Sequence, residues 1–273
     1  MKTTLADGCE LFHEIHGTGE PLVLIAGTGC DHKFWGLQVE KYIEKFQVLL
    51  VDMRGAGQSS VSPHPETYSS ELLADDVADL LESLGIEAAH IAGHSLGSCI
   101  AQQLAIRHPR SVKTLQLHAT WAHADAWLQR AFIGTTRYPL AAGDKRQTAR
   151  TVAMWMLSPE YLNSRQPESV AEMVENCLIK NPHMQANAGM LGHLFADSVH
   201  DTRGLLSDIK MPTLVTAGEA DLLIPARYGE KVAKEIPAAM FHLLGGPRSS
   251  HAYNWELAEE FNRVTYDFLA ANS

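Results

Sequence analysis

His90-Ile91-Ala92-Gly93-His94-Ser95-Leu96-Gly97-Ser98 is the stretch that decides the fold. Within it, Gly93 to Gly97 fits G-x-S-x-G, the pattern of a serine on a tight turn between a strand and a helix. Glycine is needed on both sides of Ser95 because the turn brings the strand and helix backbones together. The turn exposes the serine oxygen above the sheet, and the helix N-terminus behind it favours negative charge.

The residues around this pattern have the order that it requires. Residues 88–92 predict a short buried strand before the turn. Apolar residues at helical spacing follow it, and the helix that they predict ends near His108-Pro109. Strand, turn and helix in this order favour a nucleophilic Ser95 over an idle serine on a glycine-rich turn.

Strands and helices alternate along the chain. Apolar or alternating runs predict strands, and apolar residues at helical spacing predict helices. A turn over residues 17–19 predicts a hairpin between the first two strands. The alternation predicts an α/β fold with a mostly parallel central sheet and helices on both faces. The other predicted strands cover residues 9–15, 21–26, 47–51, 112–117, 212–217 and 240–244, and the other predicted helices cover 35–45, 71–84, 227–235 and 257–268.

One connection is too long for a plain loop. Roughly ninety residues separate the strand that ends at Leu117 from the strand that starts at Pro212. This segment is rich in Trp, Met, Leu and His, and it looks helical in pieces. We therefore predict a core domain of residues 1–122 and 209–273, with a helical cap of residues 123–208 inserted above the sheet.

Composition narrows the range of functions. With 273 residues, the chain is long enough for one large α/β domain. Its 22 basic and 32 acidic residues give a formal charge of −10, which opposes nonspecific binding to nucleic acid or to an anionic membrane. We expect a small-molecule ligand, no nucleic-acid or membrane partner, no cofactor and no metal. The composition leaves open whether the protein is a monomer or a homodimer.

The N-terminal residues and the spacing of the cysteines predict a cytoplasmic protein. Residues 1–8 contain no apolar signal core, and no apolar stretch is long enough to span a bilayer. The four cysteines, Cys9, Cys30, Cys99 and Cys177, are far apart and lack C-x-x-C spacing. We expect them to be reduced, mostly buried thiols.

A nucleophilic serine needs a base, and the base needs an orienting acid. In this arrangement both follow the serine, in loops at the carboxyl ends of late strands. Asp221 is the predicted acid because it follows an apolar strand and a turn, and Glu219 is its competitor. His251 is the predicted base because a glycine-rich loop carries it from the last strand towards the last helix. His94 adjoins the serine and is predicted to be structural.

Two backbone donors are expected for the developing oxyanion. One is the N–H of Leu96, directly after the nucleophile, and the other is the N–H of Thr28 in Gly27-Thr28-Gly29. Residues in or near the cap are expected to shape a mainly apolar substrate pocket. These predicted substrate-binding residues are Trp121, His123, Trp127, Trp155, Leu194 and Ile224.

Together these residues resemble the α/β-hydrolase superfamily over nearly the whole chain. The turn around Ser95, the segment from Asp52 to Ser59, the segment 218–225 and His251 carry the resemblance. The segment from Asp52 looks like the family's D-x-R-G-x-G-x-S loop, in which the resemblance implies that Asp52 and Arg54 brace turns. Within the superfamily, the chain is similar to small capped esterases and lactonases, the 3-oxoadipate enol-lactonase group and carbamate-hydrolase-like relatives.

The chain departs from the family pattern in two places. Many members have His-Gly before the oxyanion loop, where this chain has Ala26-Gly27. The usual Gly-Gly-His before the base is replaced by the longer run from Gly245 to His251. A serine at position 95 also argues against epoxide hydrolases and haloalkane dehalogenases, whose nucleophile is a carboxylate.

The resulting hypothesis is a serine hydrolase that cleaves a carboxylic ester or lactone of a small, largely apolar substrate. On the same fold, the three residues could instead cleave carbon–carbon bonds, thioesters or amides, or support cofactor-free perhydrolysis. In another class, the protein could be a ligand receptor on a hydrolase scaffold, or a scaffold protein that binds partners through the cap.

Overall fold

A single mixed sheet organises the part of the chain that the computed structural model describes, residues 1–174, 186–237 and 239–273. Within these residues its order is β1-β2-β4-β3-β5-β6-β7-β8. The β1–β2 and β2–β4 pairs are antiparallel and all other pairs are parallel, which confirms the predicted mostly parallel sheet. The strands are β1 (Lys2–Thr4), β2 (Glu10–His16), β3 (Glu20–Ile25), β4 (Phe46–Val51), β5 (Ala89–His94), β6 (Val112–His118), β7 (Thr213–Gly218) and β8 (Ala239–Leu244).

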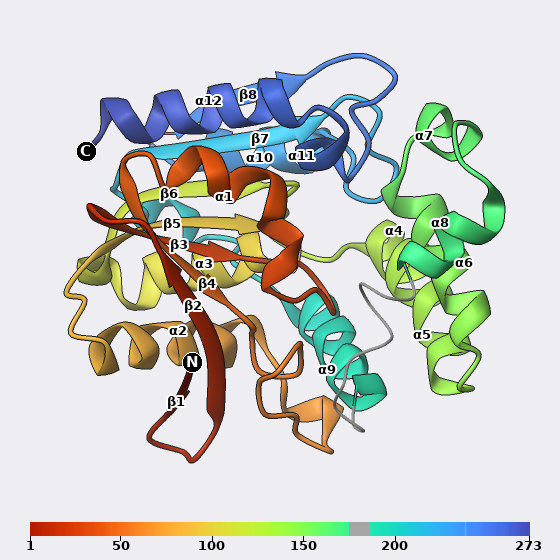
Figure 1. The fold of residues 1–273 in the computed structure, drawn as a ribbon, viewed down its shortest axis with the longest axis horizontal. Coiled ribbons are helices and arrows are strands. Elements are labelled where there is room, and N and C mark those ends of the chain that lie inside the picture. Colours follow the sequence, from red (N-terminus) through yellow and green to blue (C-terminus); the bar gives the residue numbers. More distant parts are fainter. Residues whose placement is uncertain (175–185, 238) are drawn as a thin grey trace.

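Helices cover both faces of the sheet, as the alternation predicts (Figure 1). One face carries α1 (Gly36–Tyr42), α11 (Tyr253–Glu256) and α12 (Ala258–Ala271), and the opposite face carries α2 (Ser70–Ser83), α3 (Leu96–Arg107) and α10 (Arg227–Glu235). Short 3-10 helices lie at His32–Trp35 (η1), Pro65–Thr67 (η2) and Pro109–Ser111 (η3). Because both faces are covered, every residue of β5 is buried, and so are Leu22 to Ile25 of β3.

The predicted hairpin between the first two strands is wrong. β4 lies between β2 and β3, pairing antiparallel with the first and parallel with the second. Gly17 and Gly19 do turn the chain, both with positive φ, but they cross the start of β4. A Cβ on Gly17 would lie 2.6 Å from the carbonyl oxygen of Phe46, and one on Gly19 would lie 2.1 Å from that of Lys45. The short β1, which carries no strong pattern, was not predicted.

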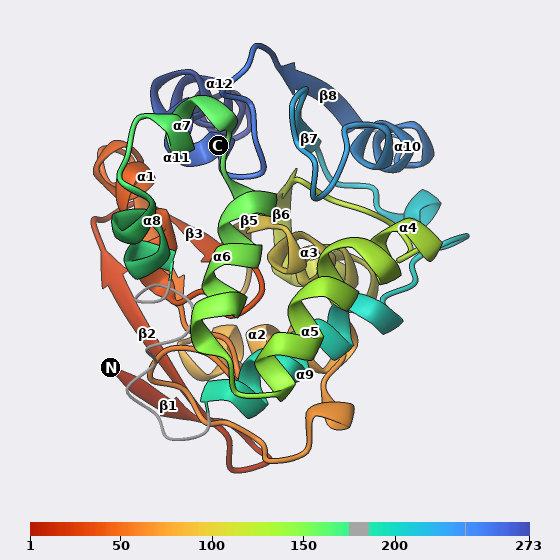
Figure 2. The same ribbon diagram turned by 90° about the vertical axis from the view of Figure 1, so that its right-hand side faces the viewer.

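The long connection between β6 and β7 is helical in the described residues. Its helices α4 to α9 lie at the carboxyl ends of the parallel strands (Figure 1), and α5 and α6 lie in front of the strands in the turned view (Figure 2). We keep the name cap for the proposed segment 123–208, which contains all of the elements given below. The elements are α4 (Ala126–Leu128), the π-helical η4 (Gln129–Ile133), α5 (Gly134–Ala141), α6 (Lys145–Met156), α7 (Pro159–Asn163), α8 (Pro167–Val174), α9 (Ala186–Val199) and η6 (Leu206–Asp208).

The described residues bear on two further predictions, which concern membrane-spanning segments and buried cysteines. None of the helices described is long and apolar enough to cross a membrane. Cys9, Cys30 and Cys99 are buried, and Cys177 lies outside the described residues.

Asp52 braces the loops that follow β3 and β4. Its fully buried carboxylate accepts hydrogen bonds from the N–H and Nδ1 of His32, both at 2.7 Å, and from the N–H of Gln58 at 2.8 Å. The hydrogen bond to Asp52 raises the pKa of His32. Arg54 contacts Asp76 and Asp7. These contacts confirm the structural role predicted for the segment that begins at Asp52.

Asp52→Ala should destabilise the fold by about 3–5 kcal/mol, because it leaves several buried hydrogen-bond donors without a partner. Urea unfolding followed by circular dichroism measures the change. Asp75→Ala is the matched control, since Asp75 pairs with Arg107 at the surface and should contribute less than about 1 kcal/mol. Equal losses in the two variants would contradict the bracing role of Asp52.

Candidate active site

Ser95 occupies a strained turn between β5 and α3. Its φ of 55° and ψ of −123° are rarely adopted by residues other than glycine. The turn is held by a 2.9 Å hydrogen bond from the N–H of Ser95 to the carbonyl of His118. A Cβ on Gly93 would lie 2.0 Å from the carbonyl oxygen of Gly97, and one on Gly97 would lie 2.2 Å from that of Ile25. Backbone contact therefore requires glycine at both positions of the motif.

His251 and Asp221 lie together behind this turn. His251 Nδ1 donates to Asp221 Oδ2 across 2.8 Å, and both side chains are buried. The other carboxylate oxygen, Oδ1, accepts from the N–H groups of Leu223 and Ile224, each at 2.8 Å. With Nδ1 donating, the lone pair of the imidazole resides on Nε2.

Glu219, the competing acid, has a different partner. Its Oε2 accepts a 2.9 Å hydrogen bond from the N–H of Gly246, and the residue is exposed. Glu219 therefore braces the loop that leads to His251, while Asp221 contacts the imidazole.

His94 connects the serine turn to His251. Its Nε2 donates to the carbonyl oxygen of His251 across 3.1 Å, and the two rings lie 4.9 Å apart. Burial, followed by the neighbouring His251 and His118, holds the pKa of His94 well below its usual range. His94 is thus a neutral donor that fixes the backbone of the candidate base.

The loop after β3 approaches Ser95 from the other side. A Cβ on Gly27 would lie 3.0 Å from Ser95 Cβ and 3.6 Å from Ser95 Oγ, so this loop touches the serine. Within the described chain, neither the N–H of Thr28 nor that of Leu96 donates to another protein atom. Both predicted oxyanion donors are therefore available to a ligand.

Helix α9 holds this loop through one of its faces. His193 Nδ1 accepts from the N–H of Gly29 at 3.0 Å, and its Nε2 donates to the carbonyl of Arg54 at 2.7 Å. One turn later, Asp197 Oδ2 accepts from the hydroxyl of Thr28 at 2.7 Å. The conformation of the loop beside Ser95 therefore depends on a helix of the cap.

A small pocket opens beside the serine, between the cap and the sheet. Its lining is apolar apart from the serine hydroxyl, one indole N–H and one carboxyl group. Burial raises the pKa of that carboxyl, Asp197, to about 7. The pocket is lined by Ser95, Trp121, Leu128, Phe132, Ile133, Asp197, Leu223 and Ile224.

Two of the six predicted substrate-binding residues, Trp121 and Ile224, line this pocket, and the other four do not. Trp127 is 48% exposed and packs beside Arg227 of α10, because it projects from the outer side of α4. Trp155 donates its indole N–H to Thr135 across 3.1 Å, which joins α6 to α5. Leu194 is buried in the hydrophobic core. The prediction that Trp127, Trp155 and Leu194 line the substrate pocket therefore needs correction.

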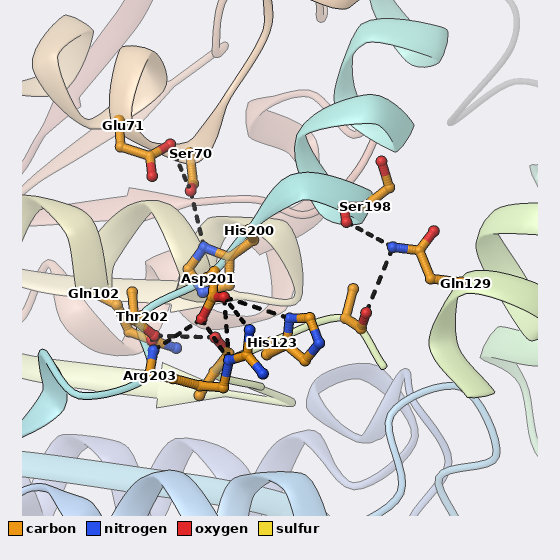
Figure 3. A network of polar contacts seen from close by, with 12 residues as sticks. Ser70, Glu71, Gln102, His123, Gln129, Ser198, His200, Asp201, Thr202 and Arg203 are labelled. Atoms are coloured by element: carbon orange, nitrogen blue, oxygen red, sulfur yellow. Dashed lines mark hydrogen bonds and ion pairs between the residues drawn. The ribbon is translucent and has the colours of Figure 1, made fainter. Parts of the chain in front are cut away.

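His123 is the fourth residue to be corrected, and it belongs to the junction between cap and core (Figure 3). Its Nδ1 lies 3.8 Å from Asp201, and the two residues form a β-bridge. Nearby, Gln102 of α3 donates to the carbonyl of Trp121 at 3.0 Å and accepts from the hydroxyl of Thr202 at 2.7 Å. The chain entering the cap and the chain leaving it are thereby tied to the same helix.

Sequence reasoning missed Asp197 and the aromatic and aliphatic residues of η4. For Asp197 a signal existed, because Met190, His193 and Asp197 recur at helical spacing within an apolar helix. Polar side chains at such positions must find partners inside the protein. For Phe132 and Ile133 no comparable signal exists, since η4 is a π-helical turn with a kink at Ala131.

Comparison with known proteins agrees with this geometry. Residues 20–254 match the family model described as the alpha/beta hydrolase fold. The chain belongs to the α/β-hydrolase family. As a member of this family it is a hydrolase, with the serine turn and the His–Asp pair at the carboxyl edge of the sheet.

Among its α/β-hydrolase relatives, one from Azorhizobium caulinodans named "Putative carbamate hydrolase RutD" is 31% identical, over 95% of this chain and 94% of its own. The enol-lactonase from Burkholderia xenovorans LB400 has a similar structure, with a TM-score of 0.86 and 26% identity, covering 99% of this chain and 100% of its own. A thermophilic esterase from Thermogutta terrifontis superposes with a TM-score of 0.84 and 26% identity, covering 100% and 99% of the two chains.

Gly93→Ala should cost about 3 kcal/mol or more, because its methyl group would overlap the carbonyl oxygen of Gly97. Urea unfolding measures the loss. In Gly36→Ala, the added methyl meets no atom within 4 Å and φ is −54°, so stability should stay within about 1 kcal/mol of the parent. If Gly93→Ala were as stable as Gly36→Ala, close backbone packing would not explain the motif.

Proposed function

We propose that this hydrolase cleaves a carboxylic ester or lactone through an acyl-enzyme on Ser95. The observation that carries the proposal is the 2.8 Å pairing of His251 Nδ1 with Asp221, adjacent to a serine turn whose neighbouring N–H groups are unpaired. Asp221 holds the imidazole in the tautomer that leaves Nε2 free to accept a proton.

In the first half-reaction, Ser95 Oγ attacks the carbonyl carbon as its proton passes to His251 Nε2. The N–H groups of Thr28 and Leu96 donate to the oxyanion that forms, and each such donor typically contributes about 3–4 kcal/mol. The C–O bond to the alcohol breaks, and the protonated His251 returns its proton to the departing oxygen. With a lactone, that alcohol remains attached to the acyl group.

In the second half-reaction, water attacks the carbonyl carbon of the acyl-enzyme and gives a proton to His251. The oxyanion again accepts from the two N–H groups, and collapse breaks the bond to Ser95 Oγ. His251 then returns the proton to the serine. The products are a carboxylic acid and an alcohol, and Asp221 remains ionised throughout.

The pocket supports a small substrate. The side chains of Trp121, Phe132 and Ile133 line the pocket with Ser95 and favour a short, largely apolar group beside the serine. Similarity to an enol-lactonase and to an esterase supports ester and lactone chemistry. The relatives named for carbamate hydrolysis support a second candidate, in which the same steps pass through a carbamoyl group on Ser95.

Ser95→Ala should lower kcat by at least about 1000-fold, because it removes the nucleophile while leaving the pocket intact. Acid release in a pH-stat measures turnover of short and long esters, γ- and δ-lactones and a carbamate. Ser83→Ala removes an exposed hydroxyl at the end of α2 and should leave the rate unchanged. Hydrolysis by Ser95→Ala at the parental rate would rule out the acyl-enzyme mechanism.

Asp221→Asn should lower kcat by roughly 10³–10⁴-fold, because an amide stabilises the wrong imidazole tautomer. Glu219→Gln should reduce kcat by less than about tenfold, since Glu219 contacts the loop before His251 and not the imidazole. Steady-state kinetics on the best ester compare the two variants. A greater loss in Glu219→Gln would make Glu219 the acid of the site.

A further inference from the structure

Asp197 is an unusual residue for the wall of this pocket. Among the described lining residues it alone carries an acid group, and most of the others are apolar. The residue is 2% exposed. One carboxyl oxygen, Oδ2, accepts from Thr28, whereas Oδ1 has no hydrogen-bond partner among the described residues. A buried, unpaired carboxyl oxygen is unfavourable, and most such groups in proteins find a partner.

The position of this carboxyl group places it near the reacting atoms. Thr28 donates its hydroxyl to Asp197 and offers its backbone N–H to the oxyanion in the proposed mechanism. Ser95 and Asp197 line the same small pocket. A substrate whose carbonyl carbon contacts Ser95 therefore occupies the pocket that Asp197 also lines.

We propose that Asp197 is a specificity-determining residue whose free oxygen accepts a hydrogen bond from a hydroxyl or amide-type N–H of the substrate. The proposal rests on the proposed hydrolysis at Ser95 and narrows its substrate class. The preferred esters are small and mostly apolar, but they carry one neutral donor a few atoms from the scissile carbonyl. An ester without a donor leaves Oδ1 unpaired in the complex and binds less well.

A neutral donor suits this pocket better than a cation. The surrounding side chains are mainly apolar, and burying a charged ligand beside them carries a large desolvation cost. A hydroxyl or an amide-type N–H supplies the missing hydrogen bond without adding a charge.

Anchoring Thr28 is a simpler role for Asp197, but it uses only one of the two carboxyl oxygens. An anchor acts on the loop beside Ser95, so its loss would change the hydrolysis of all esters by the same factor. A recognition group acts only on substrates that carry the donor. The ratio of rates for matched substrates therefore separates the two roles.

Two ester pairs supply this ratio, because each pair exchanges a hydroxyl for a methyl group of similar size. Methyl 3-hydroxypropanoate against methyl butanoate tests the acyl side, and 2-hydroxyethyl acetate against propyl acetate tests the alcohol side. For the wild-type protein, kcat/KM should favour the hydroxyl ester by about tenfold or more in at least one pair. The absence of a preference in both pairs would overturn the proposal.

Three variants assign that preference to a residue. Asp197→Leu should abolish it, whereas Asp197→Asn, which keeps an acceptor oxygen, should retain part of it. If the leucine variant fails to fold, a reduced preference in Asp197→Asn still shows that Asp197 is its source. Asp208→Asn, an exposed change in η6, should leave the ratio intact. An unaltered ratio in a folded Asp197→Leu protein would overturn the assignment.

Binding to Ser95→Ala keeps this test independent of turnover. Ligand-observed NMR with the same four esters should show about tenfold tighter binding of the preferred hydroxyl ester, lost when Asp197→Leu is added. Selective binding without hydrolysis by the wild-type protein would contradict the proposed function but uphold the role of Asp197. Hydrolysis of the esters without a preference for the hydroxyl ester, in either rate or binding, would support the proposed function and contradict the role of Asp197.

Discussion

The close approach of three backbones around Ser95 is the constraint on which the site depends. β3, β5 and α3 come so near one another that a Cβ on Gly93 or Gly97 would overlap a carbonyl group. Only with both side chains absent can Ser95 hold its φ of 55° and stand at the carboxyl edge of the sheet. The parallel register then pairs Ile25 with Gly93, which brings the loop after β3 to the height of the serine.

The same register assembles the remaining groups from distant parts of the sequence. His94 pairs with His118, so the chain leaving β6 delivers Trp121 to the pocket. His118 in turn pairs with Thr216 of β7, and the loop beyond β7 carries Asp221. Loops at the carboxyl ends of parallel strands meet at one edge, which explains how a few short segments build the site.

Helix α9 gives the cap a part in the chemistry beyond closing the pocket. His193 and Asp197, one turn apart, both bond to the loop that contains Thr28. The junction at Gln102 and Thr202 fixes the chain just after this helix to α3, the helix that follows Ser95 (Figure 3). The loop that contains Thr28, which we propose to bind the oxyanion, is thus held between the core and the cap, and its geometry depends on how the cap docks.

The sequence predicts the groups whose positions follow from chain order and strand pairing. Motif and chain order point to Ser95, Asp221 and His251, and the structure brings the last two into contact beside the serine turn. The hairpin prediction failed because a turn motif does not show whether a third strand will insert between its arms. Local patterns do not predict the positions of Trp127, Trp155 and Asp197, because the packing of cap helices depends on distant contacts.

Covalent labelling with a fluorophosphonate tests the central claim most directly, because such a reagent reacts with a serine activated by an adjacent histidine. Intact mass spectrometry followed by peptide mapping locates the adduct. The account predicts one adduct per chain, on Ser95, formed much more slowly when His251 is replaced by alanine. A folded protein that remains unlabelled, or that is labelled at another residue, would contradict it.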